Sequence, residues 1–305
     1  MARDEKEEIM GDDRDGPGGF TSRRIELAGG PIHYREAGDG HPIVFVHGFL
    51  ANGRLWDRSA AALAGGNRCI VPDWPLGSHP EAMRPDADLT PRGVAGMVSE
   101  LLAALELDDV TIVGNDSGGA VSQILVTERP ERIGRLVLTN CDCFEKFPPG
   151  RFKLMARAAR LPGASMLLAN SMRLRFMRSS PLAYGALTAG PADDEILRSF
   201  TEPSINDAGV RRDGIRFFTA ADPRDTLAAA ARFGELEIPV LLAWGVDDPF
   251  FTIGDARRLA AAIPDSTLVE IPGAGTFTAL DRPDEVAAAI ASFVGDEPRV
   301  GSRSA

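Results

Sequence analysis

Apolar runs alternate with amphipathic stretches along most of the chain. Between the apolar runs, hydrophobic residues often recur at helical spacing, most clearly in 91–107, 118–130 and 283–295. Strands that alternate with helices are typical of a parallel sheet with crossover helices. The pattern therefore predicts the α/β class, with a mostly parallel eight-stranded sheet flanked by helices. The predicted strands are the runs at residues 24–27, 31–37, 42–48, 68–73, 110–114, 134–140, 239–245 and 266–272.

This alternation stops between residues 142 and 231, where the sequence is helical and interrupted by prolines. We predict a helical cap there, inserted into a core made of residues 20–141 and 232–296. Between positions 151 and 180 the cap carries seven Lys or Arg residues and no acid. Such a stretch fits either solvated helix faces or a basic mouth that attracts an anionic substrate.

The two ends of the chain are expected to lie outside this fold. Residues 1–19 are acidic and rich in glycine, with little apolar surface to bury, which predicts a disordered acidic tail. Residues 297–305 follow the last predicted helix and form a C-terminal tail.

Composition limits the classes of function. A chain of 305 residues is long enough for one catalytic core with an insertion. A formal charge of -11 argues against a nucleic-acid partner, which requires a basic surface. No apolar run has the length of a membrane span, and the N-terminus does not resemble a signal peptide, so we expect a cytoplasmic protein without a membrane partner.

The three cysteines and four histidines lack metal-ligand spacing, so no metal or cofactor is expected. The remaining class of partner is a small-molecule substrate. A homodimer is one option for the assembly of the protein.

A sharp turn follows the predicted strand 110–114. Its sequence is Gly114-Asn115-Asp116-Ser117-Gly118, directly before a predicted helix. A strand that turns at once into a helix needs small residues two before and two after the exposed residue, which puts Asp116 at the apex. Ser117 is the alternative nucleophile, but that register would put Asn115 where a small glycine is needed.

Three motifs in this order resemble the α/β-hydrolase family over residues 22–295. They are the Asp116 turn, the loop His47-Gly48-Phe49, and the segment Trp244-Gly245-Val246-Asp247-Asp248. The resemblance implies an α/β-hydrolase fold in which the backbone N–H groups of Phe49 and Ser117 form an oxyanion hole. It also implies that His47 is structural and that Asp248, three residues after Gly245, is the acid of the catalytic triad.

An aspartate at the turn is similar to the haloalkane dehalogenase and epoxide hydrolase branch. In that branch the aspartate attacks carbon to form an ester, which a histidine-activated water then hydrolyses. The stretches 75–80, 114–120 and 139–149 also look like a subgroup of actinobacterial proteins known only as hydrolases. The resemblance makes four residues near the strand ends and in the cap candidates for substrate binding: Trp244, Asp142, Tyr184 and Phe250.

One loop departs from the family pattern. Residues 272–281 read PGAGTFTALD, and their flanks put Thr276 where the family has its catalytic histidine. Threonine has no basic lone pair near neutral pH and cannot take a proton from water as imidazole does. The side-chain donors that hold a halide and the paired cap tyrosines of epoxide hydrolases are also missing. Hydrolysis of an ester on Asp116 is therefore expected to be slow.

Three hypotheses follow. The first is a cofactor-independent enzyme that uses Asp116 for acid–base chemistry on a largely apolar natural-product intermediate, by ring closure, isomerisation, elimination or C–C bond formation. The second is a hydrolase of esters, epoxides or haloalkanes whose base is displaced to His79, in the loop after the fourth predicted strand. The third is a catalytically silent binding protein. His33 and His41 lie at strand edges and are expected at the surface.

Overall fold

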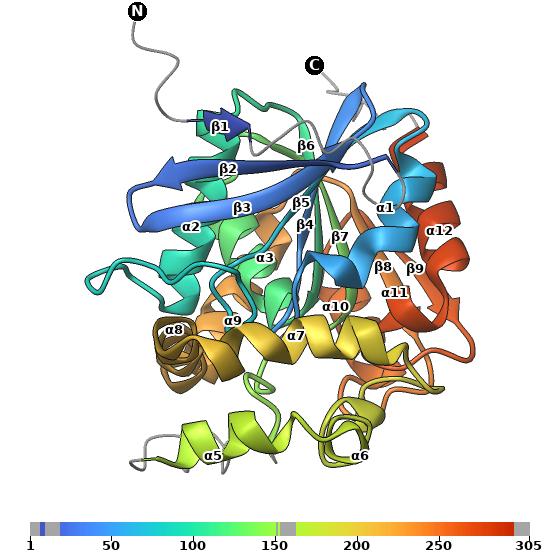
Figure 1. The fold of residues 1–305 in the computed structure, drawn as a ribbon. Coiled ribbons are helices and arrows are strands. Elements are labelled where there is room, and N and C mark those ends of the chain that lie inside the picture. Colours follow the sequence, from blue (N-terminus) through green and yellow to red (C-terminus); the bar gives the residue numbers. More distant parts are fainter. Residues whose placement is uncertain (1–6, 10–18, 151, 153–162, 296–305) are drawn as a thin grey trace, which may run out of the picture.

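A nine-stranded sheet forms the centre of the molecule (Figure 1). The computed structural model describes residues 7–9, 19–150, 152 and 163–295. The strand order is β1-β2-β3-β5-β4-β6-β7-β8-β9; the first four in this order pair antiparallel and the others parallel. The strands are β1 (Glu7–Ile9), β2 (Thr21–Leu27), β3 (Gly30–Ala37), β4 (His41–Val46), β5 (Asn67–Pro72), β6 (Val110–Asp116), β7 (Ile133–Cys141), β8 (Val240–Gly245) and β9 (Ser266–Ile271).

Eight of these strands, β2 to β9, are the eight predicted from apolar runs. The ninth, β1, lies inside the segment expected to be a disordered tail and pairs antiparallel with β2. That expectation was wrong for Glu7–Ile9, because backbone hydrogen bonds alone can add three residues to a free sheet edge. The sequence EEI carries no alternation that could signal such a strand. The rest of the predicted N-terminal tail up to residue 18, and the predicted C-terminal tail, lie outside the described residues.

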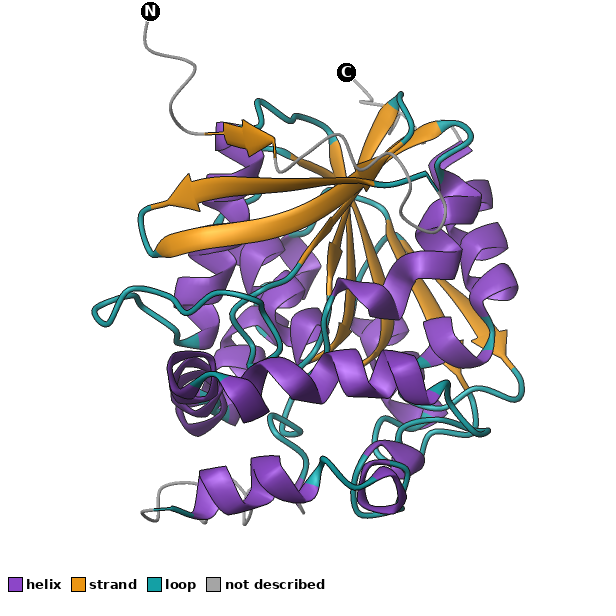
Figure 2. Ribbon diagram, in the orientation of Figure 1, coloured by secondary structure: helices purple, strands orange, loops and turns teal. Residues whose placement is uncertain are grey.

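Helices cover both faces of the sheet, as Figure 2 shows in purple around the orange strands. The α-helices are α1 (Asp57–Leu63), α2 (Pro91–Ala104), α3 (Ser117–Glu128), α5 (Ala164–Ser171), α6 (Arg175–Arg178), α7 (Asp194–Asn206), α8 (Ala208–Ala220), α9 (Pro223–Ala230), α10 (Ile253–Ala262), α11 (Thr278–Asp281) and α12 (Pro283–Gly295). Three 3₁₀ turns are η1 (Gly53–Trp56), η2 (Tyr184–Ala186) and η3 (Phe233–Glu235). Within the described ranges, no helix combines the length and apolar character that crossing a membrane requires.

The sheet separates two hydrophobic cores. Side chains on a strand point alternately to its two faces, so consecutive residues of β4 enter different cores. Val44 and Val46 pack with α2, α3 and α10, whereas Ile43 and Phe45 pack with α1 and α12. All four are fully buried. Burial on both faces explains why the central strands read as continuous apolar runs.

A helical layer lies over the carboxyl ends of the parallel strands (Figure 1). It consists of α5, α6, α7 and α8, all between β7 and β8 in the sequence. The last helix of the predicted cap segment, α9, packs instead against α3 on the flank of the sheet. Because ligands of open α/β sheets bind beyond the carboxyl ends of the strands, this layer closes the place where a site is expected.

Candidate functional site

Asp116 stands where β6 turns into α3. Its backbone has φ 52° and ψ -130°, a conformation that is uncommon for a residue with a side chain. The turn is tight because a side chain at Gly118 would overlap the carbonyl groups of Val46 and His47 on the neighbouring strand. The strained turn presents the carboxyl of Asp116 above the strand ends, as predicted for the apex residue.

Two backbone N–H groups, those of Ser117 and Phe49, hydrogen bond to the carboxyl of Asp116 itself. Gly48 makes this close approach possible, since a Cβ there would overlap the Asp116 side chain. Burial raises the pKa of Asp116 to about 7; the two N–H groups oppose the rise and the nearby charge of Asp248 adds to it. The carboxyl thus changes its protonation near neutral pH.

His47 anchors the loop that contains Gly48 and Phe49 through two hydrogen bonds. It is fully buried, its Nδ1 bonds with the carbonyl of Gly48 at 2.9 Å, and its Nε2 accepts from the backbone N–H of Trp74 at 2.8 Å. These two bonds fix the tautomer with the proton on Nδ1. Burial lowers the pKa of His47 to about 4, so the ring is neutral and both nitrogens are occupied.

Asp248 and Thr276 are bonded to each other. The hydroxyl of Thr276 donates to Oδ2 of Asp248 at 2.9 Å, and the amide of Asn140 donates to the same oxygen at 3.0 Å. The other oxygen of Asp248 accepts the backbone N–H groups of Phe250 and Phe251. Burial raises the pKa of Asp248 despite these bonds. The carboxylate is held by four donors, none of which is a base.

Thr276 is fully buried and does not border the cavity described below. Its carbonyl accepts the amide of Asn115 at 2.7 Å, which ties the loop to the Asp116 turn. Asn140 also bonds to the backbone of Gly245 in both directions, at 2.9 and 2.6 Å. The loop that was expected to carry a histidine is therefore anchored to its neighbours by hydrogen bonds from polar side chains and backbone groups.

A second carboxyl, that of Asp142, lies beside Asp116. Asp142 follows β7, and its backbone N–H donates to the carbonyl of Asp116 at 3.3 Å. Its side chain is 1% exposed and borders the cavity, and neither oxygen has a hydrogen-bond partner of ordinary geometry in the described part of the chain. Burial, and then the charge of Asp116, raise the pKa of Asp142 well above its ordinary value; the Ser117 hydroxyl opposes this only partly. The two carboxyls form a coupled acid pair.

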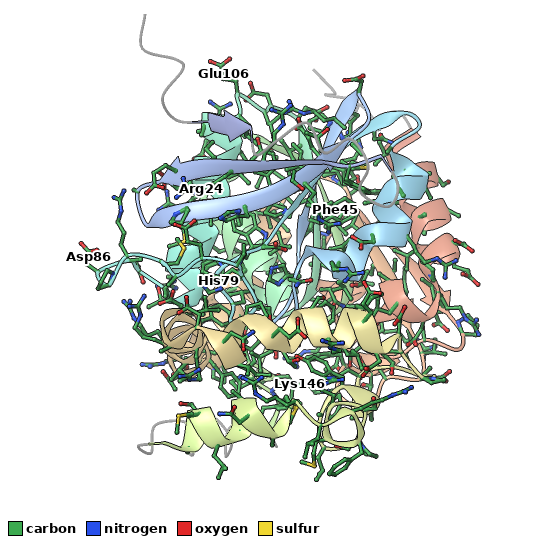
Figure 3. All side chains as sticks on the ribbon, viewed as in Figure 1. Arg24, Phe45, His79, Asp86, Glu106 and Lys146 are labelled. Atoms are coloured by element: carbon green, nitrogen blue, oxygen red, sulfur yellow. The ribbon has the colours of Figure 1, made fainter. Side chains whose placement is uncertain are left out.

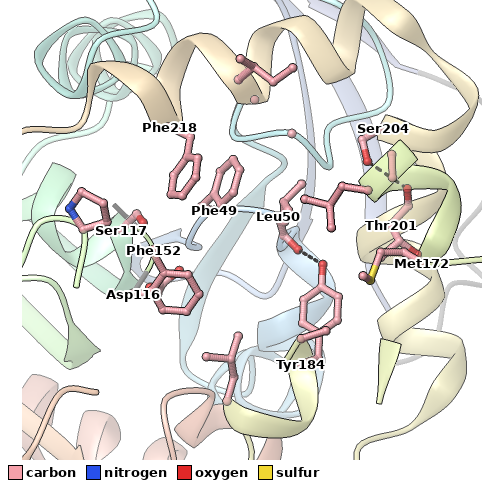
Figure 4. A pocket seen from close by; sticks show the side chains of 18 of the residues that line it. Phe49, Leu50, Asp116, Ser117, Phe152, Met172, Tyr184, Thr201, Ser204 and Phe218 are labelled. Atoms are coloured by element: carbon pink, nitrogen blue, oxygen red, sulfur yellow. Dashed lines mark hydrogen bonds between the residues drawn. The ribbon is translucent and has the colours of Figure 1, made fainter. Parts of the chain in front are cut away.

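A cavity of about 170 Å³ opens above these carboxyls (Figure 4). Most of its lining is apolar, including Phe49, Phe218 and Phe250. Polar side chains converge on it at a few points, which is usual for a site that binds small molecules. These are Asp116, Ser117, Asp142, Ser165, Tyr184, Thr201, Ser204 and Arg211. Among the described residues, no group of three or more side chains could hold a metal ion.

Tyr184, at η2, has its hydroxyl committed. It donates to the carbonyl of Leu50 at 2.6 Å, and Figure 4 shows this bond at the edge of the pocket. Burial raises the pKa of Tyr184 further above its usual range. The tyrosine therefore shapes the cavity, and its proton is not free for a substrate.

Comparison with known proteins identifies the family of this chain. Residues 41–283 match the family described as alpha/beta hydrolase fold. The chain belongs to this family. Haloalkane dehalogenase 2 of Mycobacterium tuberculosis is 30% identical to it over 291 residues, or 90% of this chain and 96% of the relative.

Solved α/β-hydrolase structures have the same fold. A single-residue mutant of the haloalkane dehalogenase DatA from Agrobacterium tumefaciens matches with a TM-score of 0.76 at 20% identity, covering 94% of this chain and 100% of that one. The epoxide hydrolase CorEH matches with a TM-score of 0.75 at 22% identity, covering 90% and 98%. These structures show the shared fold, and the family match and the sequence relative put this chain among the α/β-hydrolase enzymes, in a branch similar to haloalkane dehalogenases.

Four predicted site residues of this α/β-hydrolase are outside the lining of the cavity: Asp248 and Thr276, described above, and Trp244 and His79. Trp244 is fully buried in the core with α2, α3 and α10, and its indole N–H donates to the carbonyl of Phe251 at 2.8 Å. His79 is 2% exposed on the loop between β5 and α2, where its Nε2 lies 3.3 Å from Oδ2 of Asp213 on α8 (Figure 3). Trp244 was predicted to bind substrate, and His79 was the displaced base of the second hypothesis. Neither side chain borders the cavity, because hydrogen bonds hold Trp244 in the core and His79 against α8.

Four polar lining residues escaped the sequence analysis: Ser165 on α5, Thr201 and Ser204 on α7, and Arg211 on α8. On α8 the cavity is lined by positions 211, 214, 215 and 218, a spacing that places them on one helix face. An arginine on that otherwise apolar stripe is the signal that could have revealed this part of the site.

Proposed function

We propose that this enzyme transfers protons within a small, largely apolar substrate and does not activate water for hydrolysis. Asp116 is the base and Asp142 the acid. Reactions of this kind include isomerisation, elimination, ring closure and C–C bond formation on a natural-product intermediate. No cofactor is required, since each step moves a proton between a carboxyl and the substrate.

The proposal rests on which titratable side chains border the cavity. Four titratable side chains border the described part of the cavity, namely Asp116, Asp142, Tyr184 and Arg211, and none of them is an imidazole. The hydroxyl of Thr276 faces Asp248 instead. A water molecule at an ester of Asp116 therefore has no neighbouring base, whereas two coupled carboxyls suit the exchange of one proton.

The proton path can be written in two steps. The backbone N–H groups of Phe49 and Ser117 hold the carboxyl of Asp116, which takes a C–H or O–H proton from the substrate. Burial raises the pKa of Asp142 well above its ordinary value and so favours its protonated form, which donates a proton to a substrate oxygen. The proton taken by Asp116 then passes to Asp142, and both carboxyls return to their starting forms.

The alternative hydrolase needs His79 as a displaced base. Its Nε2 is engaged by Asp213, a carboxylate that also accepts the backbone N–H of Met83 at 2.7 Å and pairs with Arg212. A buried histidine in such a network links the core to α8. It lies apart from the lining of the cavity, which argues against a role in activating water at Asp116.

Deuterium exchange tests the proposed reaction. Acetophenone and 2-heptanone are incubated with the protein in D₂O, and proton NMR follows the loss of hydrogens next to the carbonyl. We expect exchange with the wild type and a loss of about 100-fold or more in Asp116→Asn and in Asp142→Asn, because general acid–base catalysis contributes on that scale. Asp247→Asn is the matched control, since Asp247 is exposed and outside the cavity.

Hydrolysis with many turnovers would contradict this proposal. If the wild type hydrolyses 4-nitrophenyl butyrate, styrene oxide or 1-bromobutane with many turnovers per molecule, and Asp116→Asn abolishes that hydrolysis, the enzyme is a hydrolase. His79→Ala then identifies the base, because only a displaced histidine predicts loss of turnover in that variant while the fold survives.

A further inference from the structure

Among the described residues, Arg211 is a cation at the cavity without an acidic partner. It is partly buried on α8 and borders the cavity, and within the described part of the chain its side chain makes one hydrogen bond, from Nη1 to the carbonyl of Ser204, at 2.6 Å. Other arginines of the helical layer differ: Arg178 pairs with Asp194 at 2.6 Å and Arg212 with Asp213 at 2.7 Å. Within the described ranges, Arg211 has no such carboxylate.

The surroundings of Arg211 form the polar end of an apolar cavity. Thr201 and Ser204 border the same space from α7, and Figure 4 shows both across the pocket from Asp116 and Ser117. A guanidinium that is partly removed from water loses some of its hydrogen bonds to water. A ligand anion that binds the guanidinium replaces those lost hydrogen bonds. The acid pair lies at the other end, where a second negative charge would be repelled.

We propose that Arg211 binds the carboxylate of an amphiphilic ligand whose apolar body fills the cavity and whose other end reaches Asp116. A carboxylate fits the planar guanidinium through two parallel hydrogen bonds, which gives direction as well as affinity. This assignment rests on the proposed function, since it names the class of substrate, namely apolar carboxylic acids. It also orients the substrate, with its charge away from the two carboxyls and its reacting group beside them.

Binding measurements test the assignment without any turnover. Isothermal titration calorimetry at pH 8 compares straight-chain carboxylates from butyrate to decanoate, together with 4-phenylbutyrate, with their neutral primary amides. We expect the best carboxylate to bind at least about tenfold more tightly than its amide, the scale of a hydrogen bond to a charged group. Arg211→Gln should remove that preference and leave the affinity for the amide nearly unchanged. The alkyl phosphate of equal length reports whether the site favours a planar anion.

Arg175→Gln is the matched control, because Arg175 is exposed on α6 and does not border the cavity. Equal affinity for carboxylate and amide, equal loss of both in Arg211→Gln, or the same loss in Arg175→Gln would overturn the assignment. So would the failure of every carboxylate to bind. Since the readout is affinity, it stands apart from the exchange assay: carboxylate binding without exchange would contradict the proposed reaction alone.

Discussion

Replacing Asp116 by Asn is expected to raise the free energy of unfolding at pH 8 by about 2–4 kcal/mol. Burial raises the pKa of Asp116 to about 7 in the folded state, whereas an unfolded chain has the ordinary value of 3.8. The folded protein therefore binds the proton more tightly, and the stability that this provides is complete below about pH 4. It is lost as the pH rises to about 7, because the folded state must then hold a buried charge. Asparagine carries no charge and escapes this loss.

Thermal unfolding at two pH values measures this effect. At pH 8 the variant should melt roughly 4–12 °C above the wild type, and the difference should shrink toward pH 4. Asp247→Asn, at an exposed carboxylate, should change the melting temperature little at either pH. If Asp116→Asn melts at the same temperature as the wild type at pH 8, or below it, burial does not destabilise the ionised form of Asp116 in the folded protein. A stabilising substitution that removes activity is the usual mark of a functional residue.

Replacing Thr276 by His is expected to create a hydrolase, with turnover of styrene oxide or 1-bromobutane rising by about 100-fold or more. Thr276 already donates to Oδ2 of Asp248, so an imidazole there would find its orienting acid in position. Its second nitrogen could then take a proton from water at an ester of Asp116. In the wild type the same reagents should leave a stable adduct on Asp116, with at most one product per protein molecule.

Intact-protein mass spectrometry and product release measure this change together. The adduct should accumulate in the wild type and turn over in Thr276→His. Thr276→Val is the matched control, since it removes the hydroxyl without supplying a base, and it should gain no turnover. Adding volume at a fully buried site costs about 1–3 kcal/mol, so the melting temperature of each variant is recorded alongside. A folded Thr276→His protein that neither forms nor releases the adduct would contradict the assignment of this loop.

The elements around Asp116 were predictable because local chemistry dictates them. Strands β4, β6 and β8 are buried on both faces and read as apolar runs, and the tight turn between β6 and α3 needs its glycines. The edge strand β1 was not predictable, since its sequence EEI shows no alternation of polar and apolar positions. Trp244 shows a second limit: the motif gives its place at the end of β8, while the face to which it points depends on the strand's position in the sheet.

The cavity was harder to predict than the catalytic turn. Asp142 could be located after a strand, but its burial beside Asp116 and Ser117 follows from how β6, β7 and α3 pack. Arg211 lies on a helix whose facing partner, α7, is set by the packing of the whole layer. His79 and Asp213 are far apart in sequence and meet only in the folded chain. Contacts of this kind are tertiary, and no local pattern encodes them.

We propose that the carboxyl pair of Asp116 and Asp142 holds a proton near neutral pH and replaces the imidazole that is absent from this site. Carbon-13 NMR of aspartate labelled at the side-chain carboxyl measures this directly, without a substrate. We predict that the carboxyl signals of Asp116 and Asp142 titrate above the range of ordinary aspartates, that of Asp116 near pH 7, and that one of these raised signals is lost in Asp142→Asn. If every aspartate is instead fully ionised by about pH 5, the pair holds no proton and the account is contradicted.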